Sequence, residues 1–156
     1  MVVVERAESP EIRIGDAGGD HVSIRVIGRM HPTADDYWDG NWLISPIEVA
    51  VGGFRGEVAA GLRMDELIRF REALESLQSA LQGEAVLDSM EGWIQLRVAA
   101  DRRGCLQVTG KALDQPGSAN ALTFTIDGLD QTYLPAVISA LGAAEAKFPV
   151  RGQPGQ

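Results

Sequence analysis

Residues 41–51, with the sequence NWLISPIEVAV, predict a long β-strand whose apolar side chains change face part way along. Trp42 and Ile44 occupy even positions, whereas the apolar residues from Ile47 onward occupy odd positions. A bulge shifts the facing of a strand by one residue, and proline cannot donate a hydrogen bond to a ladder. The change therefore predicts a bulge at Ser45-Pro46, on a strand at the edge of a sheet.

Six further segments alternate apolar and polar residues with a period of two, which is typical of strands that bury one face. They are residues 11–14, 22–26, 54–62, 94–98, 106–108 and 122–126. Glycine-rich turns follow several of them, such as Gly52-Gly53 after the strand at 41–51. Because strands joined by short turns cannot be parallel neighbours, the sheet is expected to be mainly antiparallel.

Two helices complete the pattern. Residues 64–82 carry an apolar stripe at spacings of three and four, and Gly83 is a natural stop. A second helix is expected with Thr132 as its N-cap, Pro135 in its first turn and Pro149 after its end. The predicted class is α+β: a mainly antiparallel, twisted sheet of about seven strands with two helices on one face, in the order ββββ-α-βββ-α.

The chain has 156 residues, the usual size of one domain. Residues 1–150 are expected to form a single α+β domain, followed by a disordered tail at 151–156, which is rich in glycine and proline. A single cysteine, Cys105, makes an intramolecular disulfide impossible. No signal peptide and no apolar run of membrane-spanning length is visible, so a cytoplasmic protein without membrane contact is expected.

The formal net charge is −8 and is spread along the chain. An acidic surface disfavours nucleic acid, whose binding depends on lysine and arginine at the phosphates. It suits a basic protein partner, through complementary potential. The alternative is that the acidity only maintains solubility.

Candidate catalytic and metal-binding residues are few. The chain has two histidines, and neither lies near Cys105 in sequence. His31, Asp35, Asp36 and Asp39 are the one cluster of metal-ligand types, but their spacing matches no known loop motif, which favours a solvated acidic loop. No phosphate-binding glycine loop is present either. The sequence therefore predicts no enzyme activity, no cofactor and no metal site.

The stretch at residues 38–43, WDGNWL, followed by Ile47-Glu48-Val49, resembles the immunity proteins of the WapI type. The pair Glu66-Leu67 at a helix start and the later segments 122–126 and 130–134 extend this resemblance over about residues 22–142. Such bacterial proteins are thought to neutralise the nuclease toxin domain of a wall-associated, contact-dependent toxin. The resemblance thus implies a non-catalytic protein that binds a basic toxin domain.

Two acidic segments are the candidate partner-binding surfaces, because acidic groups attract a basic cleft and large aromatic side chains are common interface anchors. Their residues are Asp35, Asp36, Tyr37, Trp38, Asp39, Glu84, Asp88 and Glu91. The alternative for each is a solvated loop, or an aromatic residue that anchors the loop. Two other functions remain open: an accessory domain that self-associates as a homodimer through an edge near Pro46, and a small-ligand binder with an apolar pocket.

Overall fold

The computed structural model describes residues 9–155. Its strands and helices, in chain order, are β1 (Glu11–Gly15), β2 (His21–Arg25), β3 (Gly28–Arg29), β4 (Trp42–Ile44), β5 (Ile47–Val51), β6 (Phe54–Val58), β7 (Gly61–Arg63), α2 (Met64–Ala80), β8 (Gly83–Asp88), β9 (Ile94–Ala100), β10 (Cys105–Leu113), β11 (Ala121–Asp130) and α3 (Leu134–Lys147). Short 3-10 turns precede β4 and α3. Residues 1–8 of the expected domain and residue 156 of the expected tail lie outside the described residues.

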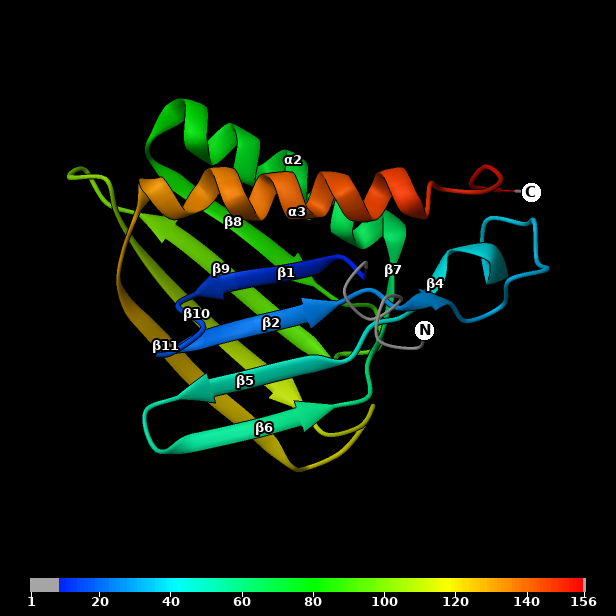
Figure 1. Cartoon of the computed structure of the whole chain (residues 1–156), viewed down its shortest axis with the longest axis horizontal. Helices are drawn as coiled ribbons and strands as arrows, with labels where there is room; N and C mark the ends of the chain where they lie inside the picture. Colours follow the sequence, from blue (N-terminus) through cyan, green and yellow to red (C-terminus); the bar gives the residue numbers. More distant parts are fainter. Residues whose placement is uncertain (1–8, 156) are drawn as a thin grey trace.

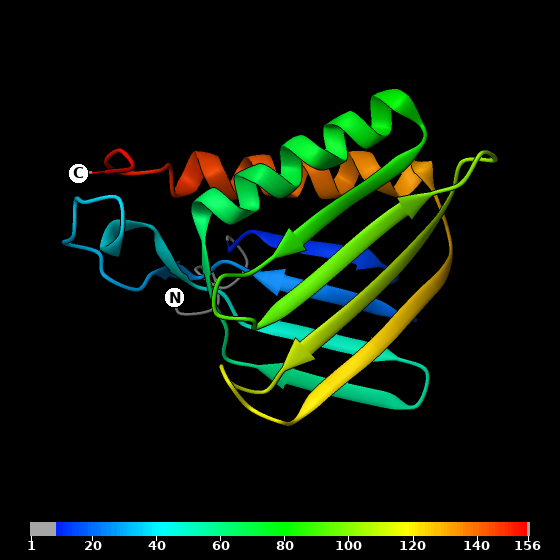
Figure 2. The same cartoon turned by 180° about the vertical axis from the view of Figure 1, so that it is seen from behind.

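The strands form three antiparallel sheets. Two sheets of four strands, in the orders β1-β2-β5-β6 and β11-β10-β9-β8, face each other, and a sheet of three strands, β3-β4-β7, lies beside them (Figures 1 and 2). The α+β class, the antiparallel pairing and the two helices are confirmed. The prediction of one sheet of about seven strands is wrong.

The chain changes sheet at Ser45-Pro46. Ser45 is fully buried, its N–H donates to the carbonyl of Ala60, and its hydroxyl accepts from the N–H of Leu62 at 2.8 Å. These bonds hold the corner where β4 ends in the small sheet and β5 begins in a large one. The break at Pro46 is therefore real, but β5 lies between β2 and β6, so the prediction of an edge strand is wrong.

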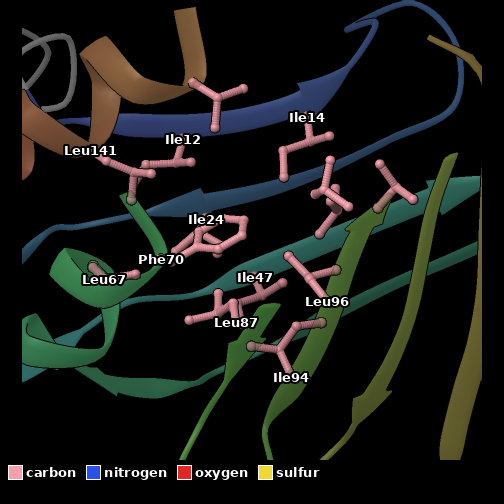
Figure 3. Close-up of a cluster of buried hydrophobic side chains, with 14 of the residues drawn as sticks. Ile12, Ile14, Ile24, Ile47, Leu67, Phe70, Leu87, Ile94, Leu96 and Leu141 are labelled. Atoms are coloured by element: carbon pink, nitrogen blue, oxygen red, sulfur yellow. The ribbon is translucent and has the colours of Figure 1, made fainter. Parts of the chain in front are cut away.

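The apolar core fills the space between the two large sheets and the helices (Figure 3). The helices α2 and α3 pack on each other, α3 lies along β1, and α2 packs on β8. They therefore close one side of the sandwich rather than covering one face of a single sheet. Labelled core residues include Ile12, Ile24 and Ile47 from one sheet, Leu87, Ile94 and Leu96 from the other, and Leu67, Phe70 and Leu141 from the helices.

The helices and the strand β8 differ in detail from the prediction. α2 ends at Ala80 with Leu81 in the left-handed conformation, and β8 is an additional strand. Before α3, the side chain of Asp130, not Thr132, accepts the capping hydrogen bond, from the N–H of Thr132. Pro135 lies in the first turn of α3, as predicted. No helix in residues 9–155 has the length and apolar character that crossing a membrane requires.

Candidate protein-binding site

A buried arginine organises the loop between β3 and β4. Arg63 is the last residue of β7, lies opposite Trp42 in the small sheet, and is 0% exposed. Its guanidinium carbon lies 5.2, 4.7 and 4.9 Å from the ring centres of Tyr37, Trp38 and Trp42. A cation held over aromatic rings and shielded from water is attracted by the ring quadrupoles. We refer to Arg63 with these three rings as the arginine cage.

Hydrogen bonds complete the arginine cage. The guanidinium donates to the carbonyl of Trp38 at 2.7 Å, to the carbonyl of Tyr37 at 2.8 Å, and to Oδ1 of Asp65 at 2.9 Å. The carboxylate of Asp65 provides the opposite charge that a buried guanidinium requires. The backbone of the loop is therefore fixed at the two residues that carry its aromatic side chains.

A buried carboxylate ties the arginine cage to the turn between β8 and β9. Glu66 accepts from the N–H of Arg63 at 2.8 Å and from the N–H of Met90 at 2.5 Å. Burial raises the pKa of the Glu66 carboxyl, against the opposing effect of these two donors. The turn that holds Met90 and Glu91 thus lies at the same end of the molecule as the start of α2 (Figures 1 and 2).

Much of the WDGNWL stretch is structural. Asn41 is fully buried; its Nδ2 donates to the carbonyls of Tyr37 and Arg151, and its Oδ1 accepts from the N–H of Arg151 at 2.9 Å. Gly40 is required by space, because a Cβ there would lie 2.8 Å from the carbonyl oxygen of Ala34. Trp42 is half-buried and forms part of the arginine cage.

The segment after α3 closes over the same loop. The guanidinium of Arg151 donates to the carbonyls of Pro32 at 2.7 Å and Ala34 at 2.9 Å. Gly152 has a φ of +67°, and a Cβ at this position would lie 2.6 Å from the backbone nitrogen of Tyr37. Residues 151 and 152 therefore lie against the loop.

Apolar side chains are exposed beside the arginine cage, on the small sheet and in the loop between β3 and β4. Trp38 is 49% exposed, Met30 42% and Ile44 44%. The N–H of Met30 donates to the carbonyl of Trp42 at 2.8 Å, and the terminal methyl of Met30 lies against Gly61. We call Met30, Trp38, Trp42 and Ile44 the apolar platform. A cluster of exposed apolar side chains with a polar border is typical of a protein-binding surface.

Acidic side chains border the apolar platform. Asp35, Asp36 and Asp39 are exposed on the loop, which we call the acidic loop (residues 35–39). The carboxylate of Asp36 accepts from the N–H of Asp39 at 3.0 Å and so stabilises the short 3-10 turn. Tyr37 is half-buried and meets Trp38 edge-on, with ring centres 5.8 Å apart. Trp38 is thus the aromatic side chain of this loop that is open to a partner.

The second acidic segment of the prediction is split by the structure. Asp88 and Glu91, at the end of β8 and in the following turn, are exposed at the same end of the molecule as the acidic loop. Glu84 lies near the opposite end of β8 and pairs with Arg97 at 3.3 Å. The structure therefore brings seven of the eight predicted residues to one end and leaves Glu84 apart.

Sequence reasoning missed Met30, Ile44 and Arg63. Met30 and Ile44 are single apolar residues with no pattern that indicates exposure. For Arg63, the signal was an arginine at the end of an apolar strand, followed two residues later by Asp65. Residues 9–155 contain no group of three or more histidine, cysteine, aspartate or glutamate side chains that could hold a metal ion, and Cys105 is exposed.

Comparison with known proteins gives one informative result. No curated protein matches the chain. The profile of the WapI-like family of immunity proteins matches residues 13–149, which is most of the chain. This range includes the loop, the arginine cage and both large sheets except the first two residues of β1. The chain therefore belongs to the WapI-like immunity protein family.

Proposed function

We propose that the protein is a non-catalytic immunity protein that binds and neutralises a basic nuclease toxin domain in the cytoplasm, through its apolar platform and acidic loop. Membership of an immunity protein family supports a toxin as the partner. The observation that carries the choice of surface is Trp38, half-exposed on a support that is otherwise fixed by the arginine cage.

Trp38 has the properties of an interface hot spot. Its carbonyl is held by Arg63 at 2.7 Å and one face of its ring is stacked on the guanidinium. A partner that covers the other face gains contact area without ordering the side chain first, which removes part of the entropic cost of binding. Met30 and Ile44 add adjacent apolar surface, as the core of a protein interface requires.

The acidic loop selects a basic partner. Asp35, Asp36 and Asp39 are exposed in the same loop as Trp38, on a protein whose net charge is −8. A nuclease presents basic groups to nucleic-acid phosphates, and an acidic surface of this kind speeds its association and competes for its cleft. Asp88 and Glu91 extend the acidic border at the same end of the molecule. Glu84, paired elsewhere, is not part of this surface.

Growth rescue tests the proposal. The C-terminal domain of any large secreted protein encoded near this one is expressed alone, with the wild-type chain, and with an Asp35→Lys/Asp39→Lys variant. Asp36 is left intact because its carboxylate stabilises the loop. The matched control is Glu72→Lys/Asp127→Lys, which makes the same charge change at exposed positions on α2 and β11. Thermal unfolding of each variant confirms that the fold is kept.

The proposal predicts that the wild-type and control chains restore growth and that Asp35→Lys/Asp39→Lys does not. Equal rescue by both variants would place the binding surface elsewhere while leaving the immunity function in place. Toxicity that the wild-type chain does not relieve would remove that toxin as the partner.

A further inference from the structure

The outer edge of β6 suggests an interaction that goes beyond toxin binding. β6 is the last strand of its sheet, on the side of the sandwich away from the helices (Figures 1 and 2). Among residues 9–155, no strand pairs with its outer edge. We propose that β6 pairs antiparallel with β6 of a second copy of the chain, about a two-fold axis at Gly56, to form a homodimer.

The other outer strands of the two large sheets are protected. α3 lies along β1, and α2 packs on β8. β11 is interrupted by a register shift opposite Leu106 and Val108, where Gly128 has a φ of +80°. Helices that cover an edge and bulges that distort it are the usual protections against edge pairing. β6 has neither, and it contains no lysine or proline.

The residues of β6 whose backbone groups point outward are placed so that a two-fold axis at Gly56 can pair them with a second copy. Val51 pairs with Phe54 across the two-residue turn at Gly52-Gly53, and residues that flank such a turn exchange hydrogen bonds. Because hydrogen-bonded and non-bonded pairs alternate, Arg55 and Glu57 direct their backbone N–H and carbonyl groups away from β5. A two-fold axis at Gly56 then aligns the outward groups of each Arg55 with those of Glu57 in the other copy.

The same register is complementary in charge. The sequence Phe54-Arg55-Gly56-Glu57-Val58 places Arg55 of each copy opposite Glu57 of the other, twice across the axis. Within one chain, Glu57 stands directly opposite Glu48 on β5, a like-charge pair that is unfavourable. Arg55 lies 3.6 Å from Glu48 in its own chain and keeps an exposed guanidinium, whereas none of the ion pairs within residues 9–155 includes Glu57. Arg55 of a second copy provides the missing opposite charge.

The inner face of β6 is apolar, and part of it is left uncovered by the rest of the chain. Phe54 is 70% exposed beside a pocket of about 270 Å³ whose apolar lining includes Ile47, Val58 and Leu122. A Cβ at Gly56 would meet nothing within 4 Å. In the proposed register, Phe54 of the second copy stands opposite Val58 and covers the open space above Gly56, while Phe54 of the first copy does the same in return.

Sedimentation velocity over a range of protein concentrations up to millimolar tests the homodimer. The variants are Arg55→Glu, which makes both cross-axis pairs acidic, and Glu57→Arg, which makes both basic. Each single variant is expected to raise the dimer Kd about 100-fold, because two like-charge pairs replace two opposite pairs. Lys111→Glu, on the exposed face of β10, is the matched control and is expected to dimerise as the wild type does. Circular dichroism checks the fold of each.

Mixing the two single variants gives the most specific readout. In a heterodimer of Arg55→Glu with Glu57→Arg, every cross-axis pair again joins an acid with a base, so the mixture is expected to dimerise with a Kd near that of the wild type, although each variant alone dimerises more weakly. The double variant Arg55→Glu/Glu57→Arg also dimerises. A wild-type chain that stays monomeric at millimolar concentration overturns the proposal. Dimerisation of the single variants at the wild-type Kd, or a mixture that stays monomeric, overturns this interface.

Discussion

The loop between β3 and β4 and the hairpin β5–β6 are both at the surface, but they are held in opposite ways. The loop is fixed by polar side chains: Arg63, Asn41 and Arg151 each donate hydrogen bonds to its backbone carbonyls. The outer edge of β6 has no such bonds within residues 9–155. The loop therefore presents preorganised side chains, which suit one specific partner, whereas β6 presents a regular backbone, which suits another strand.

The largest expected effect comes from the arginine cage. Arg63→Ala should lower the free energy of unfolding by about 3–5 kcal/mol, because Asp65 and two carbonyls lose their buried partner. Urea unfolding measures the loss. Arg69→Ala is the control, since Arg69 is exposed and pairs with the same Asp65 at 3.4 Å; it should cost at most about 1 kcal/mol. Equal losses in the two variants would contradict the role given to the cage.

A smaller loss is expected where the loop joins the C-terminal segment. Asn41→Ala removes three hydrogen bonds of a fully buried amide and should cost about 1–3 kcal/mol. Asn120→Ala is the control, because the Asn120 amide is exposed and its side-chain nitrogen donates to the carboxylate of Asp114 at 3.1 Å. If thermal unfolding shows no difference between them, the loop does not depend on Asn41.

The ion pair of His21 with Glu48 should make a still smaller contribution, and one that depends on pH. Its hydrogen bond to Glu48, at 2.9 Å, raises the pKa of His21 above the ordinary value of 6.5. The same bond lowers the pKa of Glu48 below 4.5. The His21 contribution is complete below pH 6.5 and is lost as pH rises through the folded-state pKa; the Glu48 contribution is complete above pH 4.5 and is lost as pH falls.

Glu48→Gln tests this window. The loss of unfolding free energy relative to wild type should be largest between pH 4.5 and 6.5, below about 1 kcal/mol, and should shrink toward pH 8. Urea unfolding is measured at each pH, at concentrations where the result does not depend on protein concentration. Glu72→Gln, at an exposed position on α2, is the control; its loss of unfolding free energy relative to wild type should not peak between pH 4.5 and 6.5. A Glu48→Gln difference that stays constant with pH would argue against the pair.

The smallest effect on stability is expected at β6. Phe54 is 70% exposed, so Phe54→Ala should change the free energy of unfolding of the monomer by less than about 0.5 kcal/mol. Phe124→Ala, on β11, removes a buried ring and should cost about 3–5 kcal/mol. Thermal unfolding in dilute solution compares the two. A large loss for Phe54→Ala would show that β6 depends on that ring for its own fold.

Local patterns predicted most elements of this fold. Leu67, Phe70, Leu74 and Leu77 repeat at helical spacing, and all four are buried in α2. The hairpin β1–β2 and the meander β9–β10–β11 follow their alternation, because that signal depends on near neighbours in sequence. The strand β8 was missed since Val86 is apolar but exposed, which obscures its alternation.

Features that depend on distant contacts could not be predicted. Pro46 indicated a break, but whether it marks a bulge or a change of sheet depends on Ala60 and Leu62, which bond Ser45. The acidic loop was identified from its charges, whereas its support by Arg63 and Arg151 comes from residues far along the chain. The exposure of Met30 and Ile44 likewise follows from packing of the small sheet, which sequence alone does not specify.

Hydrogen–deuterium exchange of the chain with and without its toxin domain tests the proposed binding surface most directly. Exchange in the loop between β3 and β4 and in the strand β6 is measured in the same experiment. We predict that the toxin slows exchange in peptides covering residues 30–44 and the turn at 89–92, and leaves residues 54–58 unchanged. Slowed exchange confined to residues 54–58, with no change at residues 30–44, would contradict the assignment of toxin binding to the apolar platform and acidic loop.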